Sequence, residues 1–280
     1  MPKPLHVEDI FLEEPKPHVE PVDIFKPLVE ISVAIHNQWS ITDKFLKSLF
    51  ETIKEYGKTA VNIIDNASTD STVVHLESYS KKATIFSNDT NKGYAFAHNM
   101  IMRKSFANYS CVLHNDIIMP QGWLQRMVSI MEENPKIGVL GTVNDVHGQF
   151  IIGGVLNQNG SYEYVYQDEE SGVEDKFDFI MSPCMLIRNK ALRSVGYFDE
   201  KFYLGYLCDL DYFMRMRDKG FEIGYASDVI VEHFQGSTAR LIGVNNLFEV
   251  NREKLVEKHK DWFEKNKGKA IIKKRRAEQK

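Results

Sequence analysis

From residue 29 onward, short runs of apolar and β-branched residues alternate with longer segments in which apolar side chains recur at helical spacing. The short runs predict strands and the longer segments predict amphipathic helices. The expected strands are Val29–Ile35, 60–64, 83–86 and 110–113, and the expected helices are 41–56, 71–80 and 93–106. Alternation of this kind predicts an α/β fold in which helices cover a mostly parallel sheet.

Polar residues follow three of these strands at their carboxyl ends. His36 and Asn37 come after the first strand, Asp65 and Asn66 after the second, and residues 114–116 after the fourth. Ligands of parallel α/β sheets bind beyond the carboxyl ends of the strands. The sequence therefore predicts one site, at one edge of the sheet, to which all three clusters contribute.

Four short segments carry carboxylates and small polar groups suited to a nucleotide, a diphosphate and a metal. In chain order they are Asp65-Asn66-Ala67-Ser68-Thr69-Asp70, Asn91-Lys92-Gly93, His114-Asn115-Asp116 and Cys208-Asp209-Leu210-Asp211. This ordered set resembles the signature of family-2 glycosyltransferases of the GT-A fold. Gly196-Tyr197-Phe198-Asp199-Glu200 and the late His233 extend the resemblance, which covers residues 29–240.

The resemblance implies a GT-A type α/β fold with a mostly parallel, Rossmann-like sheet flanked by helices and a smaller acceptor-side region of strands and loops. We expect a nucleotide-binding half at 29–120 and an acceptor half at 121–240. A C-terminal amphipathic segment, 241–266, is expected to be helical from residue 246. Within the acceptor half, residues 143–178 predict a hairpin plus a mobile loop over the site.

The resemblance also implies roles for individual residues. The residues expected to bind the donor nucleotide are His36, Asn37, Asp65, Asn66, Ser68, Asp70, Lys92, Gly93, Asn99 and Asn115. Asp116 and His233 are expected to bind a metal ion, whereas His114 is expected only to line the site or to be structural. Asp209 is expected to be the catalytic base, and Asp211 remains an alternative for that role.

The chemistry of sugar transfer explains these residue types. A nucleoside-diphosphate sugar, expected to be UDP-linked, releases a doubly charged leaving group, which a divalent cation can neutralise. Carboxylate oxygens suit Mg²⁺ or Mn²⁺, and an added imidazole favours Mn²⁺. The attacking hydroxyl must lose a proton, which a carboxylate can accept. The implied family inverts the sugar configuration, so one base and one displacement suffice.

Charge is unevenly distributed along the chain of 280 residues. Seven basic residues against one acid give 267–280 a charge of +6, so that the rest carries -10 within a net charge of -4. A glycan or a lipid-linked sugar is the expected acceptor. The basic tail leaves open a second acceptor, a hydroxylated base in DNA, because a cationic arm binds phosphate backbones. A base within a duplex would then have to be flipped out of the stack.

The first 28 residues differ from the rest, since they hold six of the nine prolines and contain a near-duplicated motif within residues 6–25. They predict an extended arm, with docking motifs for a partner as an alternative. Three unpaired cysteines and the lack of an apolar run of about 18 residues predict a cytoplasmic protein without a transmembrane segment, at most peripheral to membrane or nucleic acid.

Two other functional classes stay open. A nucleotidyltransferase would carry a glycine-rich phosphate loop after the first strand, where this chain has His36-Asn37-Gln38-Trp39. A non-catalytic sugar-nucleotide-binding scaffold is the other alternative, because the segment His114-Asn115-Asp116 offers a single carboxylate. Donor hydrolysis in the presence of metal would separate an enzyme from such a scaffold.

Overall fold

The structure, a computed structural model, describes residues 28–167, 177–234 and 247–265. The predicted arm (apart from Leu28), the motifs within residues 6–25 and the basic tail 267–280 lie outside these residues. The same holds for 168–176, within the predicted mobile loop. In the described stretches, no helix combines the length and apolar character that crossing a membrane requires.

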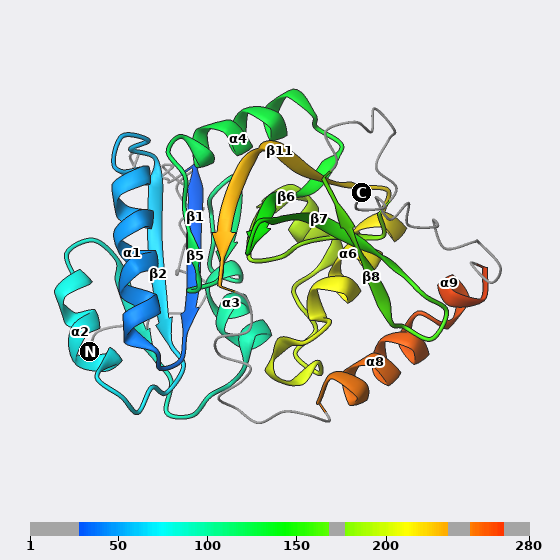
Figure 1. Ribbon diagram of the computed structural model, residues 1–280, viewed down its shortest axis with the longest axis horizontal. Helices are drawn as coiled ribbons and strands as arrows, with labels where there is room; N and C mark the ends of the chain where they lie inside the picture. Colours follow the sequence, from blue (N-terminus) through cyan, green and yellow to red (C-terminus); the bar gives the residue numbers. More distant parts are fainter. Residues whose placement is uncertain (1–27, 168–176, 235–246, 266–280) are drawn as a thin grey trace, which may run out of the picture.

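A single mixed sheet forms the centre of the molecule (Figure 1). Its parallel part has the order β3-β2-β1-β4, with β1 (Val29–Ile35), β2 (Thr59–Asp65), β3 (Thr84–Ser87) and β4 (Tyr109–Leu113). Register pairs Ile35 with Asp65, so the loops that follow β1 and β2 start side by side. This is the arrangement that the alternating pattern of strands and helices predicted.

The other part of the sheet mixes strand directions. Its strands are β5 (Ile117–Ile118), β6 (Ile137–Val146), β7 (Gln149–Leu156), β8 (Tyr162–Tyr166), β9 (Phe179–Ile180), β10 (Cys184–Arg188) and β11 (Glu222–His233). Strand β10 runs antiparallel between β4 and β6, and β11 runs parallel to β6 and antiparallel to β5. Strands β7, β8 and β9 extend from β6 as an antiparallel branch.

Helices cover both faces of the sheet because side chains alternate along each strand. On one face, α1 (Trp39–Ile53) and α4 (Trp123–Glu133) pack with Cys111 and Leu113 of β4. On the other, Val112 packs with α3 (Tyr94–Met102), α5 (Asn189–Val195) and α6 (Cys208–Asp218). A short α2 (Thr72–Leu76) and the 3-10 turns Glu77–Tyr79 and Tyr203–Gly205 complete the described core. This α/β/α layering places the ends of β1, β2 and β4 at one rim.

Two sequence-based expectations differ from the structure in detail. The hairpin predicted within 143–178 is a three-stranded antiparallel run of β6, β7 and β8. The single helix expected from 246 to 266 is two helices, α8 (Leu247–Lys258) and α9 (Lys260–Lys265), separated at His259. The break turns the His259 side chain toward the buried carboxylate of Asp211. In Figure 1 this helix pair lies beside α6 and β8.

Candidate functional site

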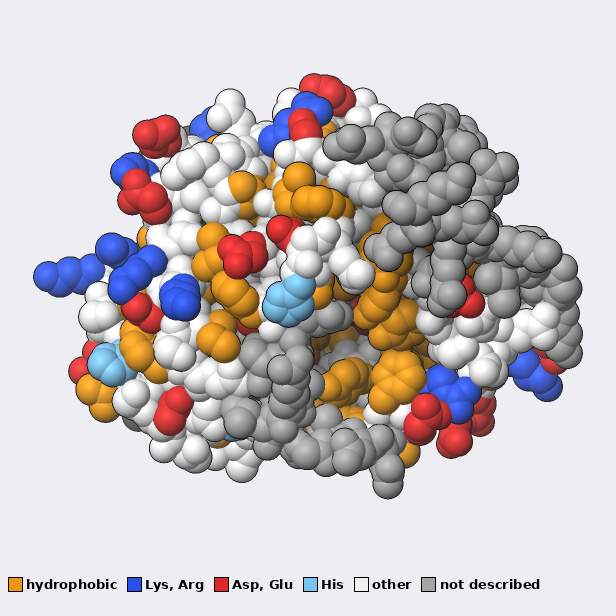
Figure 2. Space-filling view, in the orientation of Figure 1, with side chains coloured by type: hydrophobic (Ala, Val, Ile, Leu, Met, Phe, Trp, Pro, Cys, Tyr) orange, Lys and Arg blue, Asp and Glu red, His pale blue; other side chains and the backbone are white. Residues whose placement is uncertain are grey.

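A cavity of about 570 Å³ opens at the carboxyl ends of β1 and β4. Residues from both halves of the sheet line it, among them His36, Asn66, Gly93, Asp116, Asp209 and His233. Figure 2 shows a hollow in the middle of this face, with hydrophobic side chains on its walls and a histidine at its margin. The polar clusters that follow β1, β2 and β4 were predicted to meet at one edge of the sheet. Each of the three contributes to the lining of this cavity.

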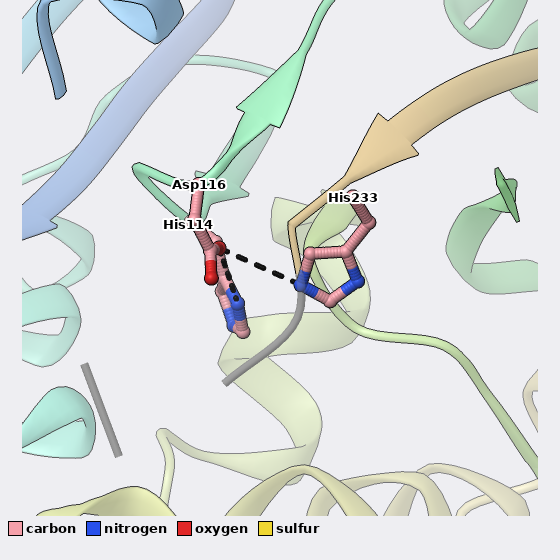
Figure 3. Close-up of side chains that lie close together, drawn as sticks. All are labelled: His114, Asp116 and His233. Carbon is pink, nitrogen blue, oxygen red and sulfur yellow. Dashed lines mark ion pairs between the residues drawn. The ribbon is translucent and has the colours of Figure 1, made fainter. Parts of the chain in front are cut away.

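Two imidazoles and a carboxylate converge in this cavity (Figure 3). His114 Nδ1 lies 3.7 Å and His233 Nε2 lies 3.5 Å from the same oxygen of Asp116, Oδ1. One ligand atom from each residue lies within 4.8 Å of the other two. The sheet produces this meeting, because β11 pairs with β5 so that His233 is opposite Ile117, next to Asp116 in the chain.

The donor set fits a divalent transition-metal ion. Burial opposes ionisation of Asp116, but the neighbouring imidazoles of His114 and His233 outweigh it and hold the pKa of this carboxyl well below its usual range. An ionised carboxylate is a ligand for Mg²⁺ and Mn²⁺, and two added imidazoles favour the transition metal. The expectation that His114 only lines the site therefore needs revision, since the structure places it in this cluster with the two predicted ligands.

Asn66 connects the loops at one part of the rim. Its Nδ2 donates to the Gly93 carbonyl (3.2 Å), and its Oδ1 accepts from the Lys92 backbone N–H (3.0 Å) and from Asn88 Nδ2 (2.9 Å). The His36 ring donates through Nδ1 to the Asn66 carbonyl (2.9 Å). One asparagine thus ties together the loops after β1, β2 and β3, and three of the tied residues, His36, Asn66 and Gly93, line the cavity.

Four more of the predicted nucleotide-binding residues form a hydrogen-bonded loop behind this wall. Asn37 Oδ1 accepts the backbone N–H groups of Thr69 (2.7 Å) and Asp70 (3.2 Å), and its own N–H donates to Ser68 Oγ (2.7 Å). Asp65 Oδ1 accepts the Ser68 N–H (3.0 Å). The structure therefore uses Asn37, Asp65, Ser68 and Asp70 to shape the loop, and none of the four contributes to the cavity lining among the described residues.

The remaining predicted nucleotide-binding residues have different surroundings. Asn115 lines the cavity, while its Nδ2 donates to Thr42 Oγ1 (2.8 Å). The Lys92 side chain is exposed outside the cavity wall. Asn99 is fully buried and binds the Phe198 backbone through both its Nδ2 (2.9 Å) and its Oδ1 (3.0 Å). Asn99 therefore holds the turn at 198–200 in place.

Asp209 lies at the start of α6, in the wall of the same cavity as His114, Asp116 and His233. Ser182 Oγ donates to its Oδ2 at 2.5 Å. Burial raises the pKa of the Asp209 carboxyl above its usual range, and the hydrogen bond from Ser182 offsets this only in part. A half-buried carboxylate with a raised pKa at a cavity wall is suited to accept a proton.

Asp211 has no access to the cavity. It is fully buried, and its carboxylate meets Arg215 Nε (2.8 Å), Lys258 Nζ (2.7 Å) and His259 Nε2 (2.8 Å). Burial opposes its ionisation, but the hydrogen bond from His259 and the charges of Arg215 and Lys258 lower the pKa to about 2. The carboxylate is thus bound to Arg215 of α6, Lys258 of α8 and His259 at the break between α8 and α9, so geometry favours Asp209 over Asp211 as the group that reaches a substrate.

Sequence reasoning missed several residues of the site. His114 offered a signal, since it stands two positions before Asp116 in the metal motif. An aromatic wall beside Asp209, formed by Tyr162, Tyr164, Tyr206 and Phe248, carried no motif. Tyr162 and Tyr164 alternate on β8, which predicts a shared face, but the pattern does not show which partner that face meets.

With this geometry established, comparison with known proteins becomes informative. Residues 30–196, more than half of the chain, match the family described as Glycosyl transferase family 2. The chain belongs to this family. It is similar to an uncharacterised glycosyltransferase of Haemophilus influenzae, with 27% identity over 123 residues, covering 43% of this chain and 38% of that protein. The match thus spans less than half of that relative's length.

Solved structures confirm the fold. GalNAc-T7 with UDP, GalNAc and Mn²⁺ superposes with a TM-score of 0.68 at 12% identity, covering 84% of this chain and 49% of that one. The mannosyltransferase PcManGT of Pyrobaculum calidifontis, with GDP-Man and Mn²⁺, gives 0.60 at 15% identity, covering 91% and 68%. S. aureus TarS 1–349 with UDP gives 0.56 at 19% identity, covering 80% and 64%. The chain has the GT-A fold that its sequence motifs predicted.

Proposed function

We propose that this glycosyltransferase moves a sugar from a UDP-linked donor to a glycan hydroxyl with inversion, with Asp209 as general base and a divalent cation held by His114, Asp116 and His233. The observation that carries the proposal is that Asp209 and the His–Asp–His cluster line the same cavity. Two structural neighbours whose descriptions name UDP, and one that names GDP-Man, support the class of donor and favour UDP.

Each half of the domain has its own task in this proposal. Residues 29–120 bind the nucleotide through the loops tied together by Asn66, and Asp65 supports one of these loops through its hydrogen bond with Ser68. Residues 121–240 add Asp209, His233 and the three tyrosines of the aromatic wall, and α8 adds Phe248. A bound divalent cation, Mn²⁺ in preference to Mg²⁺ because two ligands are imidazoles, would neutralise the charge that the diphosphate gains as it leaves.

The proposed reaction needs one displacement. The acceptor oxygen forms a bond to the anomeric carbon as the bond from that carbon to the diphosphate oxygen breaks, and the electron pair leaves with the diphosphate. Asp209 takes the hydroxyl proton. The Ser182 hydroxyl, donating at 2.5 Å, fixes the orientation of this carboxylate. Attack from the face opposite the leaving group inverts the configuration.

Aromatic side chains around Asp209 support a carbohydrate acceptor. Tyr162 lies 5.3 Å from Tyr164 and 6.0 Å from Phe248, measured between ring centroids, and Tyr206 lines the same wall. Tyrosine presents an apolar ring face and a polar hydroxyl, which match the C–H faces and hydroxyls of a sugar ring. A lipid-linked sugar offers the same chemistry and fits the same wall.

The proposal is tested by screening nucleotide sugars for stabilisation of the protein with and without Mn²⁺, because a ligand that binds only the folded state raises its stability. Stabilisation by UDP-linked sugars that depends on Mn²⁺, followed by turnover on an oligosaccharide, is the expected result. Binding without any turnover would indicate a non-catalytic scaffold. Turnover only on duplex DNA with hydroxylated bases, lost on removal of 267–280, would replace the glycan by the alternative acceptor.

A further inference from the structure

Residues 204–207 form part of the cavity wall, and Asp209 follows two positions later. This segment begins within the last 3-10 turn and ends at the start of α6. Three of its residues have left-handed backbone conformations: Leu204 (φ 54), Gly205 (φ 100) and Leu207 (φ 65). Left-handed leucines are unfavourable without outside support, so contacts from elsewhere must hold this segment in shape.

Asn251 of α8 provides such contacts. Its side chain is fully buried, and Nδ2 donates to the carbonyls of Tyr203 (3.1 Å) and Tyr206 (3.0 Å). One amide group thereby bridges two carbonyls three residues apart in the segment. One turn further along α8, Lys254 Nζ donates to the Lys201 carbonyl (3.0 Å).

The opposite side of the segment packs tightly against α3. A Cβ placed on Gly205 would lie 2.4 Å from Tyr94 Cβ, and one placed on Gly93 would lie 3.1 Å from Leu204 Cα. The segment is therefore held between the start of α3, which belongs to the nucleotide side, and α8. Tight packing prevents the segment from moving toward α3. If the contacts from α8 were lost, the segment could therefore move only away from α3.

Helix α8 is in turn fixed to the helix that carries Asp209. Lys258 and His259 bind the buried Asp211 of α6, and Leu255 packs in the same hydrophobic cluster as α6. Phe248 of α8 reaches the cavity wall. All of these contacts lie beyond residue 196, where the family match ends, so they are features that the family match does not include.

We infer that Asn251 is a positioning residue for catalysis: it fixes the turn at 203–207, and through it sets Tyr206 and Asp209 against the reacting atoms. The inference rests on the proposed function, in which Asp209 is the base. It makes the C-terminal helix pair a working part of the active site. A displacement of about 1 Å at a catalytic group costs on the order of 10²-fold in rate, so a small loosening of this turn has a large kinetic effect.

The variant Asn251→Asp tests this, because it keeps the size of the side chain and removes both donated hydrogen bonds. Asn189→Asp is the matched control. Asn189 is 1% exposed, and its Nδ2 also donates to a backbone carbonyl, that of Ala107 (2.9 Å), but it lies outside the cavity lining. Both variants are measured for thermal unfolding, for Kd of UDP with Mn²⁺, and for kcat of donor hydrolysis with water as acceptor.

We expect Asn251→Asp to lower kcat by about tenfold or more and to change the Kd of UDP by less than about threefold. Asn189→Asp should lose stability but keep kcat. Hydrogen exchange at amides 203–209 should quicken in Asn251→Asp alone, a readout that needs no activity. If Asn251→Asp does not fold, Asn251→Ser is compared with Asn189→Ser.

Unchanged exchange at 203–209, or equal losses of kcat in the two variants at equal stability, would overturn the inference. A wild-type protein without hydrolysis of any UDP-sugar would instead count against the proposed function. Exchange at 203–209 then still decides whether Asn251 holds the turn.

Discussion

The surroundings of Asp209 and of Asp211 are opposite, although the two residues are neighbours on α6. Asp209 lies half-buried in the cavity wall with one hydroxyl donor, Ser182, and a raised pKa. Asp211 is fully buried against Arg215, Lys258 and His259, and its pKa is lowered to about 2. The difference separates two uses of one residue type: a carboxylate that can take up a proton, and a carboxylate that holds helices together.

The largest effect should come from the cluster of His114, Asp116 and His233, which lines the same cavity as Asp209. Asp116→Asn removes the carboxylate shared by His114 and His233, so we expect transfer to fall to the background rate in Mn²⁺. Steady-state turnover and circular dichroism check activity and fold. Wild-type turnover by a folded Asp116→Asn protein would contradict the metal assignment.

The next prediction concerns Asp211, the carboxylate that holds helices together. Asp211→Asn leaves Arg215 and His259 without this carboxylate, whereas Lys258 keeps Asp199 at 2.6 Å. We expect a loss of about 2–3 kcal/mol in the free energy of unfolding, since Arg215 and Lys258 are partly exposed. Urea denaturation measures this loss. Activity below the unfolding range should stay within about threefold of wild type, because Asn251 keeps its hydrogen bonds to the Tyr203 and Tyr206 carbonyls in this variant. An unchanged unfolding midpoint would show that the contacts of Asp211 with Arg215, Lys258 and His259 add nothing to stability.

Low pH should reduce the stability of the wild type more than that of Asp211→Asn. A folded-state pKa of about 2, below the 3.8 of an ordinary aspartate, gives Asp211 a stabilising contribution that is present above the unfolded pKa and lost as pH falls toward 2. Wild-type stability should therefore fall through this range, and Asp211→Asn should show a flatter dependence. Thermal unfolding at a series of pH values measures the slope. Parallel curves would contradict the assignment.

The two carboxylates should also separate in the pH dependence of activity. The raised pKa of Asp209 means that its proton is lost at higher pH than that of an ordinary carboxyl group. Because a general base acts when deprotonated, kcat/KM should fall on the acid side at a pH above the usual carboxyl range of about 4. A profile that stays flat down to pH 4 would argue against Asp209 as base.

The smallest effect is expected at His233. One carboxylate and His114 remain in His233→Ala, so metal binding should weaken without being lost, and the preference for Mn²⁺ over Mg²⁺ should decline. Turnover titrated with each ion gives this ratio. An unchanged ratio would mean that His233 is not a ligand.

Much of the nucleotide side could be predicted because its determinants are local. Each strand ends in its own polar loop, and parallel pairing brings the loops together, as with Ile35 and Asp65. Motifs did not show that Asn37, Ser68 and Asp70 bond to one another behind the wall. A pattern of residue types predicts that a polar loop is present, but it does not predict which of its side chains form hydrogen bonds within the loop.

The acceptor side could be predicted less well because long-range packing decides it. Asp209 and Asp211 are both acids in the first turn of α6, and their surroundings differ because Ser182 contacts Asp209 whereas Lys258 and His259 reach Asp211. The break at His259 and the contacts of Asn251 with Tyr203 and Tyr206 depend on how two distant segments meet. No periodicity within either segment contains that information.

The most direct test compares Asp209→Asn and Asp211→Asn in kcat and in thermal stability, measured side by side with UDP binding as a check on the fold. We expect Asp209→Asn to lose on the order of 10²–10⁴-fold in kcat while it binds UDP and gains stability at neutral pH, because a buried charge is removed. Asp211→Asn should lose stability and keep kcat. An active Asp209→Asn protein together with an inactive but folded Asp211→Asn protein would contradict the account.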